Sequence, residues 1–254
     1  MDDIHTARGL GARTVAVGSS QQLVERLGFA PGSPVKIIVA DDHPLICAAL
    51  THALHGAMPE SSILTASTLS ALQAALGDHA DLDLVLLDLH MPGAKGFSSL
   101  VLLRGERPEL PVILISSNDH PRTIRRAQQF GAAGFLPKSA TLEQMLEAIG
   151  AVMSGETWFP SYKAHRSAED AQLAARLAQL TPQQMRVLMC MADGLLNKQI
   201  AHELGLAENT VKVHVTAVLH KLGCHSRTHA AVLVKALEAE GAPESVSPEA
   251  TEII

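Results

Sequence analysis

The stretch VLLDLHMPG, from Val85 to Gly93, places a carboxylate at the end of an aliphatic run and follows it with Met-Pro-Gly. The residues before Asp88 have the composition of a buried β-strand, and Pro92 and Gly93 are typical of the turn that ends one. A charge at the end of a buried strand costs free energy unless another group pairs with it. The fold must therefore bring a partner for Asp88 from elsewhere in the chain.

Short β-rich runs alternate with helix-like segments on both sides of this stretch. The β-rich runs occupy residues 35–42, 62–67, 83–89, 111–117 and 134–138. The helix-like segments occupy residues 44–57, 67–79, 96–110, 120–132 and 141–155. Strands that are apolar on both faces and alternate with helices predict a parallel sheet covered by helices on both sides. We expect an α/β unit with the flavodoxin-like strand order 2-1-3-4-5.

Residues 176–240 contain helical patterns and no strand-like run. The first helix is predicted within residues 180–194, where Thr181 and Gln184 form a capping-box pattern. Three further helices are predicted within residues 197–205, 206–223 and 226–241. A short turn containing Gly205 separates the second from the third, which is the helix-turn-helix pattern. We therefore expect a second, all-α unit of four helices.

The remaining segments and the composition complete the expected organisation. Residues 1–34 are predicted to be a weakly ordered extension, residues 156–175 a linker, and residues 241–254 an acidic disordered tail. The chain has 254 residues, 47% of them apolar, and a net charge of −6. No apolar run approaches the roughly 18 residues of a membrane span, so we expect no membrane association. The three cysteines are scattered without metal-ligand spacing, which favours reduced thiols in a cytoplasmic protein.

Acidic residues end two of the predicted strands. Asp41 and Asp42 end the first strand, and Asp88 ends the third. In the order 2-1-3-4-5, the carboxyl ends of these two strands meet at the point where the strand order reverses, which is where ligands bind in such sheets. Several carboxylates in one place repel each other unless a cation neutralises them, and hard oxygen ligands suit Mg²⁺. The sequence therefore predicts a Mg²⁺ site at this edge.

Two more polar side chains are expected at the same edge, because Ser116 follows the fourth strand and Lys138 the fifth. A divalent cation, a hydroxyl group and an ammonium group around one carboxylate are what a phosphoryl group in transfer requires. Asp88 would then be the nucleophile and would form an acyl phosphate.

These motifs resemble those of a known family. VADDHP, LLDLHMPG, ILISS and GFLPKS are similar to the acid-pocket, phosphoacceptor, hydroxyl and lysine motifs of response-regulator receiver domains. Residues 180–223 resemble the LuxR-type DNA-binding domain. In this order the two resemble the NarL/FixJ family of two-component transcription regulators, with the receiver in residues 35–155 and the helix-turn-helix domain in residues 176–240.

The resemblance implies roles for individual residues. Asp41, Asp42 and Asp88 would hold Mg²⁺ together with the main-chain carbonyl of His90. Ser116 and Lys138 would contact the phosphoryl oxygens, and Phe135 would be the aromatic residue that rotates inward when the hydroxyl shifts. The DNA contacts implied by the helix-turn-helix are Lys212, Val213 and Thr216 to base edges, and Lys198, Thr210, His214 and Lys221 to phosphates.

The resemblance also implies a function. The protein would be a cytoplasmic DNA-binding regulator rather than an enzyme, phosphorylated by a cognate sensor histidine kinase. Phosphorylation would move the fourth helix, fifth strand and fifth helix of the receiver, and so change a dimerisation face. The partners would be this kinase, double-stranded DNA and a second copy of the chain.

Three positions depart from the family pattern. Thr216 stands where a longer polar residue is common, so the base preference should differ. Ala207 occupies the expected N-cap of the recognition helix, where Ser is usual. His229 stands three residues after Ser226, where a capping-box Glu often occurs.

Three other functions fit parts of the pattern. A phosphatase of the haloacid-dehalogenase type also uses a strand-end aspartate, but it needs a second Asp at the position of His90. A flavodoxin-like electron carrier needs aromatic residues to stack on a flavin, and the chain has one Trp and one Tyr. A regulator with a vestigial pocket would keep the architecture without the switch, which the complete set of pocket residues argues against.

Overall fold

The computed structural model describes residues 34–160 and 168–238, and the predicted extension at 1–34 and tail at 241–254 lie almost entirely outside them. Its sheet has five parallel strands in the order β2-β1-β3-β4-β5, as predicted. The strands are β1 (Lys36–Ala40), β2 (Ser62–Ala66), β3 (Leu84–Asp88), β4 (Val112–Ser116) and β5 (Gly134–Pro137). The three central strands are almost completely buried, which explains why their sequences are apolar on both faces.

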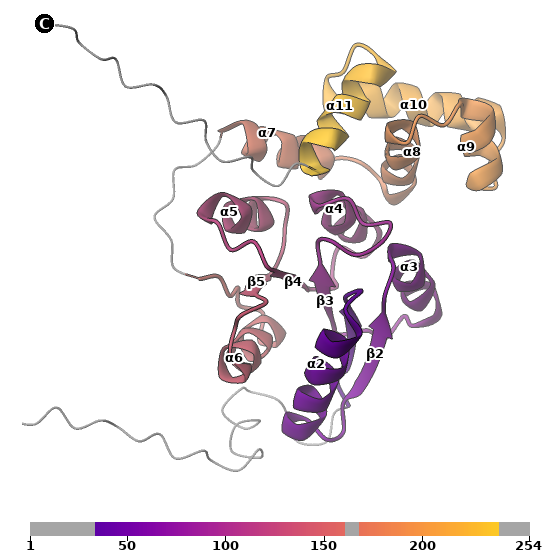
Figure 1. The fold of residues 1–254 in the computed structure, drawn as a ribbon. Coiled ribbons are helices and arrows are strands. Elements are labelled where there is room, and N and C mark those ends of the chain that lie inside the picture. The colour runs from indigo at the N-terminus through magenta and orange to yellow at the C-terminus, as the bar shows by residue number, and fades with distance from the viewer. Residues whose placement is uncertain (1–33, 161–167, 239–254) are drawn as a thin grey trace, which may run out of the picture.

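Five helices cover the two faces of this sheet (Figure 1). They are α2 (Pro44–Ala57), α3 (Leu69–Asp78), α4 (Phe97–Glu106), α5 (Pro121–Gln129) and α6 (Leu142–Met153). Alternate strand residues contribute to two different hydrophobic clusters: Ile37 packs with residues of α2 and α6, and Ile38 with residues of α3, α4 and α5. The period-two pattern of the strands therefore separates two cores, one on each side of the sheet.

The second half of the chain is entirely helical in the part that the structure describes. Helix α7 (Ala168–Leu177) precedes the four predicted helices, which are α8 (Pro182–Ala192), α9 (Asn197–Glu203), α10 (Glu208–Leu222) and α11 (Arg227–Glu238). The turn between α9 and α10 contains Gly205 at φ +64°, a conformation that favours glycine. None of the helices in the described ranges is both long and apolar enough to cross a lipid bilayer.

Local capping explains where several helices begin. Thr141 and Gln144 form a reciprocal capping box at α6, and Thr181 and Gln184 form another at α8. Helix α10 begins after Ala207, whose side chain cannot accept a hydrogen bond from the first turn. The N-terminus of the helix that would read DNA is therefore without a side-chain cap.

Replacing Ala207 with Ser is expected to stabilise the helical half by about 1 kcal/mol, because a serine at this position can accept an N–H of the first turn. Thermal unfolding followed by circular dichroism measures the gain. The same replacement at Ala171, an exposed position inside α7, is the matched control and should give no gain, since serine is a poorer helix former than alanine. Equal shifts for both variants would contradict the capping explanation.

Candidate functional site

Three carboxylates meet at the carboxyl ends of β1 and β3. Asp88 is the last residue of β3 and is completely buried, and Asp41, directly after β1, is 1% exposed. One ligand atom each from Asp41, Asp42, His43 and Asp88 lie within 4.8 Å of one another. The parallel pairing of β1 with β3 produces this meeting, because it places Ala40 beside Leu87 and so aligns the ends of the two strands.

Lys138 is the partner that the buried position of Asp88 requires. Its Nζ lies 2.9 Å from Oδ2 of Asp88 and 2.8 Å from Oδ2 of Asp41. Its main-chain N–H donates to the carbonyl of Ser116, which fixes the residue at the end of β5. Burial would lower the pKa of Lys138, but the hydrogen bonds and charges of Asp41 and Asp88 outweigh this and raise the pKa above its usual value of 10.5. The amine is therefore protonated at neutral pH and bridges the two buried carboxylates.

The hydroxyl and the aromatic residue lie on the two strands beyond β3. Ser116 is the last residue of β4, is fully buried, and accepts the main-chain N–H of Asn118 at 3.1 Å. Phe135 lies fully buried in β5 and pairs with Leu114 of β4, two residues before Ser116. Both residues are thus on strands that end at the carboxylate cluster.

Two histidines border the cluster. His90 donates its main-chain N–H to Oδ1 of Asp88 at 3.2 Å, so the backbone after β3 folds back onto the carboxylate. His43 was not predicted as a site residue, yet its Nδ1 lies 3.0 Å from Asp41 and 2.8 Å from Asp42. Its position directly after the two aspartates was the available signal. Because His43 contacts two carboxylates of the predicted metal site, it belongs to the same cluster of possible ligands.

The donor set fits Mg²⁺. Asp41, Asp42 and Asp88 supply hard carboxylate oxygens, and the single ammonium group of Lys138 cannot neutralise three carboxylates. A divalent cation would remove the remaining repulsion. The main-chain carbonyl of His90 remains a predicted ligand.

Replacing Lys138 with Met is expected to destabilise the protein by about 3 kcal/mol, because it leaves two buried carboxylates without their cation. Millimolar Mg²⁺ should raise the melting temperature of this variant more than that of the wild type, since the metal becomes the main counter-charge. Calorimetry with and without Mg²⁺ measures both effects. An equal Mg²⁺ effect on Lys138→Met and on the wild type would show that the metal binds elsewhere.

The predicted base-reading residues form an exposed face of α10. Lys212, Val213 and Thr216 are all exposed, and Val213, at 68%, is an unusually exposed aliphatic side chain. Nζ of Lys212 lies 3.1 Å from the Glu208 carboxylate, and the Thr216 hydroxyl donates to the Lys212 carbonyl. The opposite face holds the buried Val211, Val218 and Leu222. The apolar periodicity of α10 thus turns its polar residues outward.

The predicted phosphate contacts differ in their surroundings. Lys198 and Thr210 are exposed, and His214 is partly buried. Lys221 donates to the carbonyl of Gln179 and to the side chain of Gln184, so two of its three N–H groups tie α10 to the start of α8. Lys221 therefore has a structural task that its sequence position did not indicate.

Comparisons with known proteins identify a domain family for each half of the chain. Residues 37–150 match the response regulator receiver domain, and residues 178–234 match the luxR family of bacterial regulatory proteins. The chain is 39% identical over 204 residues to a glycerol metabolism activator of Pseudomonas putida, covering 77% of this chain and 92% of that protein. It is 33% identical to the nitrate/nitrite response regulator NarL of Escherichia coli K12, covering 79% and 95%. A structure of the response regulator RcsB with DNA aligns over 81% of this chain and all of that one, with a TM-score of 0.47 and 20% identity.

Proposed function

The chain belongs to the NarL/FixJ family of two-component response regulators, and we propose that it is a transcription regulator switched by Mg²⁺-dependent phosphorylation of Asp88. A cognate sensor histidine kinase supplies the phosphoryl group in the cytoplasm. The phosphorylated protein forms a homodimer that binds double-stranded DNA. The receiver and LuxR-type matches favour this function over the phosphatase and the electron carrier.

Asp88 acts as the nucleophile in the proposed modification. Its carboxylate oxygen attacks phosphorus, the bond from phosphorus to the donor breaks, and an acyl phosphate forms. A bound Mg²⁺ supplies charge neutralisation for the phosphoryl oxygens and the surrounding carboxylates. Lys138 is already within hydrogen-bonding distance of Asp88 and can turn its ammonium group toward a phosphoryl oxygen. The Ser116 hydroxyl can donate to another oxygen.

The same contacts provide a switch. A phosphoryl group adds about two negative charges and several acceptors at Asp88, which draws Ser116 and Lys138 toward it. Ser116 precedes α5, and Lys138 follows β5, so both elements respond to the modification. Phe135, fully buried in β5, is the side chain whose rotation would carry the change to the surface. The changed surface at α5, β5 and α6 then pairs with a second copy.

The DNA-reading task falls to α10. The second helix of a helix-turn-helix presents its N-terminal half to the major groove, where Lys212 can reach guanine acceptors and Val213 can contact a thymine methyl group. Lys198, Thr210 and His214 supply phosphate contacts. Pairing two such helices in a dimer doubles the contacts and makes dimerisation an effective control of affinity.

The observation that carries this proposal is the placement of Lys138 between Asp41 and Asp88 at the end of the sheet, because it reproduces the charge arrangement a phosphoryl acceptor requires. The test treats the full chain with Mg²⁺ and acetyl phosphate, and then measures its mass, oligomeric state and affinity for genomic DNA fragments. We expect one added phosphoryl group, a dimer and tighter DNA binding. An unmodified chain, or a modified chain with unchanged assembly and affinity, would contradict the proposal.

A further inference from the structure

Glu208 is the first residue of α10, the helix that carries the proposed base contacts. Its carboxylate lies 3.1 Å from Nζ of Lys212, one turn further along the helix, and the two side chains are 48% and 57% exposed. A helix-turn-helix presents the N-terminal half of its second helix to the base edges of DNA. The ion pair therefore occupies the place where DNA is expected to be read.

A carboxylate on this face opposes DNA binding in general. It repels the phosphates of any sequence, and so it lowers the affinity that exposed lysines provide. An acid in the first turn can stabilise the positive end of a helix, but that role needs the carboxylate near the free N–H groups. Here the carboxylate lies against Lys212, while Ala207 leaves the N-terminus of α10 without a side-chain cap. A hydrogen-bond donor on the DNA would offset the repulsion.

The ion pair matches the edge of one kind of base pair. In the major groove a G·C pair presents two acceptors, N7 and O6 of guanine, followed by one donor, the N4 amino group of cytosine. A hydrogen bond of about 2.9 Å joins O6 to N4, close to the 3.1 Å between Lys212 and Glu208. An A·T pair places its donor between two acceptors, so an ammonium group followed by a carboxylate meets one acceptor fewer. The geometry therefore favours G·C, with Lys212 on guanine and Glu208 on cytosine.

The C-terminal end of α10 is anchored to the segment that joins α7 to α8. Lys221 donates to the carbonyl of Gln179 at 2.9 Å and to Oε1 of Gln184 at 2.7 Å. Nη1 of Arg176 in α7 donates to the carbonyl of Leu222 at 3.2 Å. Side chains that read bases must be held by a rigid element. The ion pair at the other end of α10 meets this condition, because the helix cannot turn without breaking these contacts.

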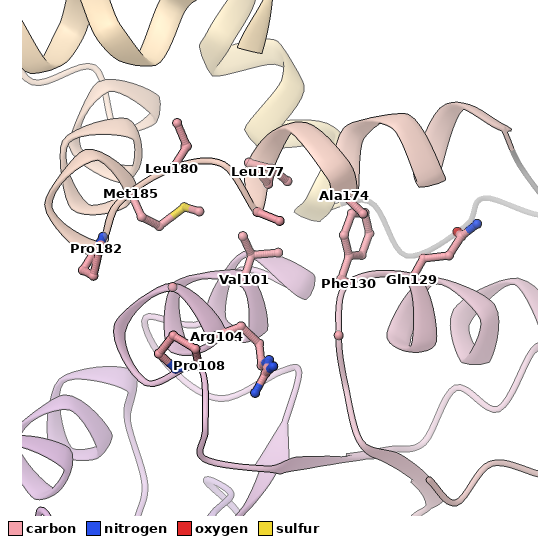
Figure 2. Close-up of a pocket in the computed structure, with 13 residues that line it drawn as sticks. Val101, Arg104, Pro108, Gln129, Phe130, Ala174, Leu177, Leu180, Pro182 and Met185 are labelled. Carbon is pink, nitrogen blue, oxygen red and sulfur yellow. The ribbon is translucent and has the colours of Figure 1, made fainter. Parts of the chain in front are cut away.

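The loosely packed part of the helical half lies elsewhere. A cavity of about 380 Å³ separates the helical half from the receiver (Figure 2). Leu177 and Leu180 line it from one side, and Val101 and Phe130 line it from the other. Its described lining residues come from the receiver, α7, α8 and the turn between them, whereas α10 packs on α7, α8, α9 and α11. The incomplete packing is therefore at the contact with the receiver and not around the ion pair.

We propose that Glu208 is a base-reading residue, whose carboxylate accepts a hydrogen bond from the N4 amino group of the cytosine paired with the guanine that Lys212 contacts. This inference rests on the proposed function, because it concerns the DNA that the active dimer reads. It adds a second specific contact at one base pair. It also makes the preference directional, since exchanging G·C for C·G moves the donor and the acceptors to opposite ends of the edge.

The test measures binding of the full chain, treated with Mg²⁺ and beryllofluoride, to a duplex selected from genomic fragments. The base pair read by Lys212 is the one at which Lys212→Ala loses its preference when each pair of the duplex is changed in turn. Its cytosine is then replaced with 2-pyrimidinone, which can still pair with guanine but lacks the amino group. The wild type should lose affinity about tenfold. Glu208→Ala should lose less than about twofold, because it has no carboxylate to leave unpaired.

Two control variants distinguish a base contact from a general effect of charge. Glu203→Ala removes an exposed carboxylate at the end of α9 and should lose as much affinity on the modified duplex as the wild type does. Glu208→Gln keeps an acceptor oxygen without the charge and should show an intermediate loss. Removing the Glu208 charge should also tighten binding to unrelated DNA, since it removes a repulsion with the phosphates. The ratio of affinities for the normal and the modified duplex therefore reports base reading.

The outcomes separate this inference from the proposed function. An equal loss on the modified duplex for the wild type and Glu208→Ala, or no loss for either, would overturn the base contact and leave phosphorylation-controlled DNA binding intact. A loss shared by the wild type and Glu203→Ala but absent from Glu208→Ala would support it. A wild type that selects no DNA after beryllofluoride treatment would contradict the proposed function, and the base contact with it.

Discussion

Replacing Asp88 with Asn is expected to abolish the response to acetyl phosphate. No acyl phosphate should be measurable under conditions that modify the wild type completely. An amide cannot act as the nucleophile, and its neutral oxygen no longer attracts the ammonium group of Lys138. The variant should also lose the increases in dimerisation and DNA affinity that acetyl phosphate produces. Intact-protein mass spectrometry and sedimentation measure these losses.

The control for this prediction is Asp78→Asn, because Asp78 is an exposed carboxylate at the end of α3, outside the cluster. It should take up one phosphoryl group as the wild type does. Continued phosphorylation of Asp88→Asn would show that another residue is the acceptor. Normal DNA binding by an unmodified Asp88→Asn chain, equal to that of the phosphorylated wild type, would instead show that the pocket is vestigial.

Replacing Lys212 with Ala is expected to weaken binding of the dimer to its preferred DNA site about tenfold, the effect of losing one specific base contact. The contact with Glu208 holds Lys212 on the exposed face of α10 before DNA arrives, which limits the conformational entropy lost on binding. Fluorescence anisotropy, with a duplex selected from genomic fragments bound by beryllofluoride-treated protein, measures the change.

The comparison of specific with unrelated DNA decides what Lys212 contacts. A base contact should reduce affinity for the selected site and leave binding to unrelated DNA nearly unchanged. A phosphate contact would instead weaken binding to all sequences equally. It would also reduce the slope of log affinity against log salt concentration by about one. Lys235→Ala removes an exposed lysine from α11 and should leave the preference for the selected site intact.

Much of the fold could be predicted because local patterns and tertiary structure agree. The strand runs are apolar on both faces, which occurs when helices cover a parallel sheet, and their order follows from the flavodoxin-like topology. The carboxylate cluster follows in turn, because parallel strands end at the same edge. Asp41, Asp88 and Lys138 therefore meet as the strand-end positions indicated.

The contacts between the halves could not be predicted in the same way. Arg126 is a polar residue on a strongly polar helix, and nothing local indicates that it becomes 2% exposed between two aromatic rings and the end of α11. Lys221 resembles a solvent-exposed phosphate contact, yet it binds Gln179 and Gln184. Such placements depend on residues distant in sequence, and periodicity carries no information about them.

A crystal structure of the full chain with Mg²⁺ and beryllofluoride tests directly whether Asp88 is the phosphoryl acceptor of a magnesium site. We expect beryllium bonded to a carboxylate oxygen of Asp88, Mg²⁺ held by Asp41, Asp42 and Asp88, and Ser116 and Lys138 turned toward the fluorines. Beryllofluoride bound at any other residue, or a magnesium ion outside this group of aspartates, would contradict it.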